Sequence, residues 1–279
     1  MTDAAAPGVV LRRLIVCADD FALHAGVSQG IVQLAAQGRL SATSALVLAP
    51  CWAQDAPRLR EWRGRLDVGL HLDWTSDFAR AQGHGRPLAR LMAQALLGRL
   101  RAEQARPVIE RQLDAFEAHW QAPPDHVDGH QHVQQFAGIR EALVQVLQAR
   151  YGHQLRWPYL RVSRPPLGAR GLKSRLIAGM GADALELIAK EAGLARASAL
   201  FGIYDFKGDV AAYARRMAAW LADAPDGAIL MCHPATASTA LDAISRARQL
   251  ELAFLASPAW PQALTLAGLR LARGGDMLA

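Results

Sequence analysis

The chain has 279 residues, 52% of them hydrophobic and 20% charged, which is the composition of a globular protein that buries a sizeable core. Its net charge of +6 comes from arginines scattered without a recognised nucleic-acid motif, so we expect a solvated basic surface and no nucleic-acid partner. It lacks a membrane-length apolar run, a signal peptide and any CxxC spacing, so we expect a cytoplasmic protein with no membrane partner and no disulfide framework.

Strand-like apolar runs alternate with helical stretches rich in Ala, Leu and Arg. The runs predict strands over residues 14–18, 43–48, 67–72, 126–128, 159–162, 228–232 and 264–269. The stretches between them predict helices over residues 26–37, 87–100, 107–121, 139–150, 182–192, 210–222 and 240–256. This repetition is typical of an α/β fold with a largely parallel sheet. We predict a single-domain (β/α) barrel, regular or else irregular or incomplete, with an open doubly wound sheet as the alternative.

We expect one catalytic domain over residues 1–279, in which residues 1–12 form a flexible N-terminal segment. Two segments, 74–90 and 163–181, are rich in Gly, Pro and Arg and follow predicted strands. In an α/β barrel such loops lie at the carboxyl ends of the strands, where active sites are built. They either form the walls of a substrate groove or are inert insertions.

Acidic and imidazole side chains stand at the ends of four predicted strands, in the segments CADD (17–20), VGLHLDW (68–74), DHVDGHQHV (125–133) and MCHPA (231–235). Strand residues alternate between the two faces of a sheet. Asp128, His130 and His132 therefore point to one side if the strand continues through them. His71 and Asp73 share a face for the same reason.

Asp19 and Asp20 would point apart in a regular strand, so both reach one cleft only if the chain turns at the strand end. Two carboxylates this close repel each other, and without a cation one of them would stay protonated. Taken singly, such residues are more often helix caps or hydrogen-bonded structural groups. Together they predict a metal-assisted hydrolase, because one carboxylate with two imidazoles and open positions is a typical catalytic metal site that activates water.

The segments CADDFALHAGVSQGI, VGLHLDWT, DHVDGHQHV and MCHPA resemble the four signature motifs of the YdjC-like carbohydrate deacetylases. The resemblance runs from about residue 13 to residue 270, and SRARQLELAFLASPAW is similar to the closing helix of that family. It implies a (β/α) barrel similar to that of NodB-type deacetylases. It also implies a homodimer that removes N-acetyl groups from chito-oligosaccharides or a related acetylated sugar.

Carried over residue by residue, the resemblance makes Asp20, His71 and His130 the ligands of one divalent metal ion. It makes Asp19 the general base, and His233 the acid or a group on the oxyanion side. Further residues that support the metal site or contact the substrate are His132, Asp128, Asp73, Arg164 and Trp74, with Phe78 as another candidate for sugar contact. His132 and His130 are also candidates to exchange roles.

The resemblance leaves the metal and the substrate open. It implies Mg²⁺, whereas imidazole ligands suit Zn²⁺, Co²⁺ or Ni²⁺. Ala22 and Ala235 stand where the family usually has glycine, which removes no ligand but bears on the sugar site. Two alternative functions remain: a metal-dependent hydrolase of a phosphoester or a non-sugar amide, and a non-catalytic sugar- or metal-binding protein on the same scaffold.

Overall fold

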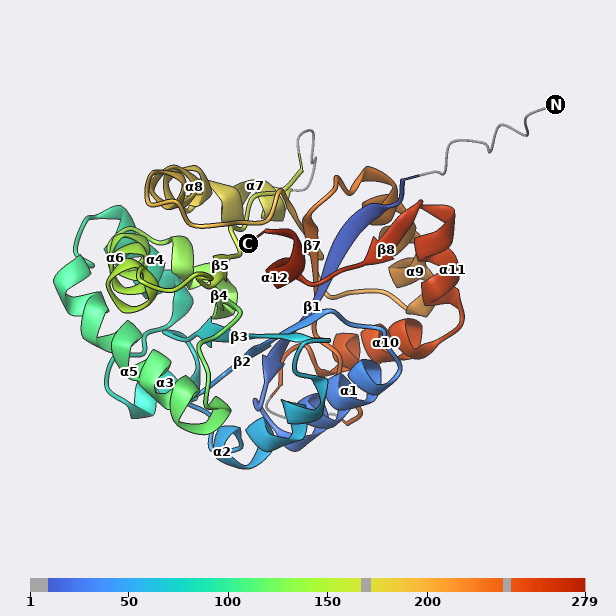
Figure 1. Cartoon of the computed structure of the whole chain (residues 1–279), viewed down its shortest axis with the longest axis horizontal. Helices are drawn as coiled ribbons and strands as arrows, with labels where there is room; N and C mark the ends of the chain where they lie inside the picture. The colour runs from blue at the N-terminus through green and yellow to red at the C-terminus, as the bar shows by residue number, and fades with distance from the viewer. Residues whose placement is uncertain (1–9, 167–171, 238–241, 279) are drawn as a thin grey trace.

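A curled parallel sheet forms the centre of the molecule, and helices surround it (Figure 1). The computed structural model describes residues 10–166, 172–237 and 242–278. In these residues eight strands make one sheet in the order β5-β4-β3-β2-β1-β7-β6, and β8 pairs with β1. The strands are β1 (Arg12–Phe21), β2 (Ala42–Ala45), β3 (Asp67–Leu72), β4 (His126–Gly129), β5 (Tyr159–Leu160), β6 (Leu200–Phe201), β7 (Ala228–Cys232) and β8 (Leu269–Leu271).

The two ends of this sheet meet through an irregular segment instead of a full strand pair. Leu160 of β5 forms a single bridge with Arg196, in the segment that leads into β6. The N–H of Leu200 in β6 then donates to the carbonyl of Arg164 at 2.7 Å. The fold is therefore an irregular, incompletely closed (β/α) barrel, as the sequence predicts.

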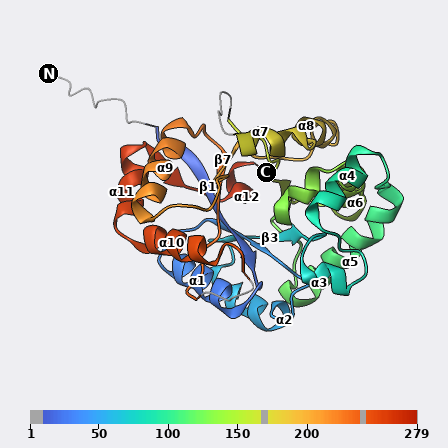
Figure 2. The ribbon, with the colours of Figure 1, turned by 180° about the vertical axis from the view of Figure 1, so that it is seen from behind.

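The helices pack around the outside of the barrel. They are α1 (Ala25–Ala36), α2 (Trp52–Asp55), η1 (Ala56–Trp62), α3 (Asp77–Ala81), α4 (Leu88–Leu96), α5 (Ala102–Trp120), η2 (His130–Gln135), α6 (Ile139–Tyr151), α7 (Leu172–Gly179), α8 (Ala182–Glu191), α9 (Val210–Asp223), α10 (Ser245–Ala256), α11 (Ala259–Leu266) and α12 (Gly274–Met277). Figures 1 and 2 show α1, α9, α10 and α11 around the part of the barrel that contains β1 and β7, and α4, α5 and α6 around the part that contains β3, β4 and β5. None of the helices in the described part of the chain is long and apolar enough to cross a membrane.

Strand β1 has two buried faces because it separates two apolar clusters. Leu14 and Val16 belong to the large core between the sheet and the helices. Ile15 and Cys17 belong to a smaller core, with Ile229 of β7, inside the barrel. Burial of both faces explains why the first strand reads as a continuous apolar run. The same alternation places Asp19, two residues after Cys17, on the interior face near the end of the strand.

Helix α12 covers the end of the barrel at which the strands begin. The N–H of Gly275 donates to the carboxylate of Asp67, the first residue of β3, at 3.0 Å. The Tyr159 hydroxyl donates to the same carboxylate at 3.2 Å. At position 274 a Cβ would lie 2.2 Å from the Tyr159 ring, so only glycine lets α12 approach this closely. The opposite end of the barrel, formed by the carboxyl ends of the strands, lies away from α12.

Several predicted boundaries agree with the structure and others need correction. The predictions for β3 and β7 match residue for residue, and helix α6 begins where predicted. The last strand was predicted over 264–269, but these apolar residues end helix α11 and β8 begins at Leu269, after Gly268 at a positive φ of 64°. Of the predicted flexible segment 1–12, residues 1–9 lie outside the described residues, and Arg12 already belongs to β1.

The alternation assumed for Asp128, His130 and His132 is wrong, because β4 does not continue through them. The strand ends at Gly129 and the short helix η2 begins at His130. Within η2, Gln131 and His132 have positive φ values of 54° and 62°, which turn the chain away from the strand direction. The three side chains are therefore placed by a turn and not by the pleat of a sheet.

Asp125, just before β4, provides a test of the polar contacts at the amino end of the barrel. Burial, with the nearby charge of Asp67, raises the pKa of Asp125 to about 6. Between the unfolded pKa of about 3.9 and this value the folded protein binds more protons, so stability falls as the pH rises. We expect Asp125→Asn to be neutral at pH 4 and to raise the free energy of unfolding by about 2 kcal/mol at pH 7.5.

Urea unfolding at both pH values measures this difference. Asp183→Asn is the matched control, because the Asp183 carboxylate is 90% exposed. An Asp125→Asn protein that is less stable than the parent at pH 7.5 would contradict the prediction.

Candidate active site

The carboxyl ends of five strands bring buried acidic, basic and imidazole side chains together. Asp19 and Asp20 come from the end of β1, His71 from β3 and Asp128 from β4, and Arg161 directly follows β5. All five are at most 2% exposed. His233, which directly follows β7, completes the group from the other side of β1. This is the rim at which α/β barrels place their active sites.

A backbone irregularity turns two adjacent carboxylates toward the same group of side chains at the carboxyl-end rim. The pairing of β1 with β2 shifts register between Ala18 and Phe21, and Asp20 between them has a positive φ of 69°. Asp19 then reaches toward β5, and Asp20 toward β3 and η2. A left-handed non-glycine residue costs of the order of 1 kcal/mol or more, and such strain is typical of functional sites. The expected turn at the end of the first strand is thus present.

Three residues at this rim form a compact group of metal-type donors. The Asp20 Oδ1 atom lies 3.1 Å from His130 Nδ1 and 3.4 Å from His71 Nε2. One ligand atom from each of the three residues lies within 4.8 Å of the other two. The His130 side chain is 23% exposed, whereas the other two are 2% exposed. A carboxylate and two imidazoles that open to solvent on one side fit a single divalent cation.

The orientation of His71 is set by Asp128. His71 Nδ1 lies 2.6 Å from the Asp128 Oδ1 atom, so the other ring nitrogen, Nε2, faces Asp20. Burial alone would lower the pKa of His71, but the Asp128 charge and hydrogen bond outweigh it and raise that pKa to about 10. A carboxylate behind a ligating imidazole in this way is the common support of metal-binding histidines.

Two buried arginines, which the sequence analysis did not identify, neutralise the two adjacent aspartates. Arg161 donates to both carboxylate oxygens of Asp19, at 2.6 and 2.8 Å. Arg248 of α10 donates to the Asp20 Oδ2 atom at 2.7 Å and to Asp242 at 2.6 Å. Burial would raise the pKa of both aspartates of the pair, but the arginines hold the pKa of Asp19 below its usual range and that of Asp20 well below it.

This corrects one step of the sequence analysis. Asp19 and Asp20 both ionise without a metal, because each has its own guanidinium partner. A metal is therefore not required to keep the pair charged. The signals for the arginines were present in the sequence: Arg161 is a charged residue inside a predicted strand, and Arg248 lies three residues before Glu251 on one face of a helix.

His233 lies close to Asp19 on one side and is held on the other by Glu251. Its Nε2 atom lies 3.9 Å from the Asp19 Oδ2 atom. Its backbone N–H donates to the Glu251 Oε2 atom at 2.5 Å, and its Nδ1 atom lies 3.9 Å from Oε1. The Tyr204 hydroxyl donates to the same Oε1 atom at 2.7 Å, and the Phe206 ring meets the imidazole edge-on at 5.3 Å between centroids. Glu251 was also missed by the sequence analysis.

His132 lies near the cluster but outside the group of three donors. Its Nδ1 atom shares a hydrogen bond of 2.8 Å with the Ser163 hydroxyl. Burial and the charge of Arg161 lower the pKa of His132 to about 3, so this imidazole is neutral. The structure places His130, and not His132, beside Asp20.

The other residues named from the sequence lie away from these donors. Asp73 is buried and accepts hydrogen bonds from the backbone of residues 75 and 76 at 3.0 Å, so it shapes its own loop. Trp74 is 2% exposed and packs against His84, which leaves almost no ring surface for a sugar. Arg164 is half exposed and lies 3.6 Å from Asp183. Phe78 is half-buried in α3, and the part of loop 163–181 over 167–171 lies outside the described residues.

A family model described as YdjC-like protein matches residues 13–265. The chitooligosaccharide deacetylase of Serratia marcescens is 30% identical over 136 residues, which cover 44% of this chain and 50% of the relative. The carbohydrate deacetylase of Homo sapiens is 30% identical over 175 residues, which cover 56% of this chain and 49% of the relative. The chain thus spans about half the length of the curated relatives it matches.

Two solved structures show the same fold. A protein of Enterococcus faecalis V583, with a proposed role in cellobiose-phosphate cleavage, has a TM-score of 0.72 at 20% identity and covers 96% of this chain and 100% of its own. The Xyl-CE4 domain of a multidomain xylanase from the Trinervitermes trinervoides hindgut metagenome has a TM-score of 0.52 at 8% identity. The match covers 95% of this chain and 89% of that domain. At these identities the likeness concerns the fold alone.

The ion pair between Arg161 and Asp19 provides a test of the electrostatics of this site. We expect Arg161→Met to lower the free energy of unfolding by about 3–5 kcal/mol, because it leaves Asp19 and Asp128 buried without their cation. Addition of Asp19→Asn should recover part of that loss. Urea unfolding at pH 7 measures each variant. Arg13→Met, which breaks an exposed pair with Asp226, is the control, and a similar loss in both single variants would contradict the prediction.

Proposed function

Because the chain belongs to the YdjC-like protein family, we propose that it is a carbohydrate deacetylase that hydrolyses the N-acetyl group of an acetylated sugar, such as a chito-oligosaccharide, with one divalent metal ion. One observation carries the proposal: the Asp20, His71 and His130 donors converge at the carboxyl-end rim of the barrel. His233 Nε2 lies 3.9 Å from the Asp19 Oδ2 atom at the same rim.

The donor set fits a single cation. Asp20 Oδ1, His71 Nε2 and His130 Nδ1 would hold it, and Asp128 would support His71 from behind. A divalent cation bound there supplies a Lewis acid that polarises an acetamide carbonyl and makes water more acidic. Imidazole donors favour Zn²⁺ or another transition metal, whereas the family resemblance favours Mg²⁺. A test of metal dependence therefore has to include both Mg²⁺ and the transition metals.

Asp19 and His233 are suited to move protons on the two sides of the scissile bond. Arg161 keeps Asp19 ionised and fixes both of its oxygens, so the carboxylate is available to accept a proton from the attacking water. His233, anchored through its backbone by Glu251, would donate a proton to the departing amine. Hydrolysis then yields acetate and the free amino sugar.

The geometry disfavours a two-metal phosphoesterase. Such enzymes hold two cations about 3.5–4 Å apart. The common two-oxygen bridge of a carboxylate needs both oxygens, and in this site the Asp20 Oδ2 atom accepts from Arg248 at 2.7 Å. A non-catalytic sugar- or metal-binding protein remains the outcome if metal binds without turnover.

We also propose that the protein is cytoplasmic and does not bind nucleic acid. All three cysteines are free, which supports a reducing, cytoplasmic location. Some of the arginines near the surface are paired with carboxylates, as in Arg13 with Asp226 and Arg196 with Glu186, which supports a solvated surface without nucleic acid. One catalytic domain over residues 1–279 and a homodimer stay predictions.

Metal dependence is tested by the release of acetate from N,N′-diacetylchitobiose with Mg²⁺, Zn²⁺, Co²⁺, Ni²⁺ or EDTA. We expect one of these ions to support release and EDTA to abolish it. Asp20→Asn should lower both metal binding and the rate by about 100-fold or more, because it removes the charged ligand. Asp226→Asn, at an exposed carboxylate far from the rim, is the control. Release that survives EDTA would contradict the proposal.

The acid role of His233 is tested by the leaving group. We expect His233→Ala to lower kcat on the sugar amide by about 10²–10⁴-fold, with metal binding unchanged. With 4-nitrophenyl acetate the loss should shrink, because a phenolate departs without a proton. Asp19→Asn should be impaired on both substrates, since both need activated water. Equal losses for His233→Ala on the two substrates would assign it another role.

A further inference from the structure

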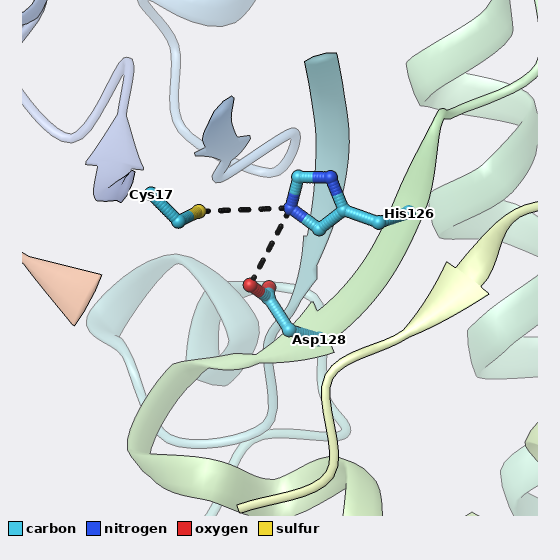
Figure 3. A group of neighbouring side chains, drawn as sticks. All are labelled: Cys17, His126 and Asp128. Carbon is cyan, nitrogen blue, oxygen red and sulfur yellow. Dashed lines mark hydrogen bonds and ion pairs between the residues drawn. The ribbon is translucent and has the colours of Figure 1, made fainter. Parts of the chain in front are cut away.

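Four buried polar residues lie inside the barrel directly beneath the candidate metal site. They are Cys17 of β1, Ser44 of β2, and His126 and Asp128 of β4, each at most 1% exposed. Figure 3 shows the Cys17 thiol and the Asp128 carboxylate pointing at the same ring nitrogen of His126. The His126 Nε2 atom lies 3.7 Å from Cys17 Sγ and 3.7 Å from Asp128 Oδ2.

A thiol, an imidazole and a carboxylate would together suit a second metal site of the kind that binds zinc. In this protein, however, the Ser44 hydroxyl already forms hydrogen bonds with all three groups. Ser44 Oγ donates to Asp128 Oδ2 at 2.5 Å. It lies 3.2 Å from Cys17 Sγ and 3.1 Å from His126 Nε2. A serine hydroxyl has one hydrogen to donate and two lone pairs that accept. One bond to Asp128, one from the thiol and one from the imidazole N–H therefore use its whole capacity.

The surrounding charges also favour hydrogen bonds over a cation. Arg161 Nη1 lies 3.0 Å from Asp128 Oδ2, the oxygen that a metal in this group would need. Burial, with the charge of Asp19, raises the pKa of the Cys17 thiol well above its usual value, so the sulfur keeps its proton. A cation at this position would have to displace that proton and sit against a guanidinium.

Packing fixes the ring of His126, and with it the geometry of this group. The ring stacks on Tyr159 with 5.0 Å between centroids and 22° between planes. On the neighbouring strand, a Cβ at Gly69 would lie only 2.3 Å from the imidazole, so the ring packs directly against the backbone of this glycine. The other residue of the stack, Tyr159, packs in the same way against Gly274 of α12. The imidazole therefore has little room to leave Ser44.

We propose that Ser44 is a positioning residue, which fixes the Asp128 carboxylate so that it holds His71 in the orientation needed to bind the metal. Ser44 and Arg161 occupy the Asp128 Oδ2 atom, which leaves Oδ1 to accept from His71 Nδ1 at 2.6 Å. His71 Nε2 is thereby directed at Asp20. Cys17 and His126 complete the hydrogen bonds of Ser44 and are not ligands. This inference rests on the proposed metal-dependent function.

The experiment measures Zn²⁺ affinity of the metal-free protein by competition with a chromophoric chelator. Ser44→Ala removes no proposed ligand, and we expect it to weaken Zn²⁺ binding by about 10–100-fold, the usual effect of losing a group that supports a ligand. Thr43→Val is the matched control, because the Thr43 hydroxyl is equally buried and donates to the Ala18 carbonyl at 2.7 Å. Both variants should lose stability, but only Ser44→Ala should lose affinity.

Cobalt spectra separate this inference from a second metal site. We expect one Co²⁺ per chain without a thiolate-to-cobalt charge-transfer band, and the same stoichiometry in Cys17→Ser. Two Co²⁺ per chain with a charge-transfer band that Cys17→Ser removes would overturn the inference. Equal Zn²⁺ affinity in Ser44→Ala and the parent would overturn it as well, while the proposed function would stand. No metal binding by the parent would contradict both.

Discussion

The buried contact of Arg161 with Asp19 and Asp128 is the interaction on which the rest of the site depends. One guanidinium, 0% exposed, joins carboxylates from β1 and β4 to the end of β5. Without it, two ionised groups would lie in the barrel interior unpaired, at a cost of several kcal/mol each. With it, the Asp128 carboxylate is charged and rigid enough to hold His71. The ion pair thus supports the proposed base and the proposed metal ligand at the same time.

Buried charges of opposite sign lie close together in the metal-free cluster. The carboxylates of Asp19, Asp20 and Asp128 face two guanidiniums, from Arg161 and Arg248, and the His71 imidazolium, whose pKa is about 10. Arg248 also pairs with Asp242, so four carboxylates face three cations and the group carries one net negative charge. A divalent cation bound in place of the His71 proton would make this group neutral, so it would leave no buried charge uncompensated.

The sequence predicted the parts of the fold that rest on local pattern. β7 was found because a strand buried on both faces reads as a continuous apolar segment, and β3 because three apolar residues in its DVGLHL run mark a short buried strand. β6 was missed because it has two residues, Leu200 and Phe201, and owes its existence to pairing with β7. The turn after Gly129 was missed because positive φ at Gln131 and His132 follows from the tertiary fold and leaves no mark in residue type.

The candidate site divides in the same way. Asp20, His71 and His130 were identified because each stands at a strand end within a recognisable segment, and the structure brings them together. The arginine partners escaped because Arg161 lies 142 residues from Asp19 and Arg248 lies 228 residues from Asp20. The sequence signals for these arginines, a charge inside a predicted strand and a charge three residues before Glu251, do not say which distant carboxylate each one pairs with. From the sequence, a metal was therefore expected to neutralise the Asp19 and Asp20 carboxylates, whereas in the structure Arg161 and Arg248 do so.

The interior of the barrel is asymmetric, and the asymmetry explains why a small hydroxyl matters there. On the side of β6 and β7 the interior is apolar, with Leu200, Ile229 and Met231. On the side of β2 and β4 it is polar, with Ser44 and Asp128. An apolar wall excludes water, so each polar atom opposite it must find its partner within the protein. Ser44 meets that demand because one hydroxyl can donate once and accept twice. The orientation of His71, a proposed metal ligand, is therefore set by a residue that lies deeper in the barrel than the proposed ligands themselves.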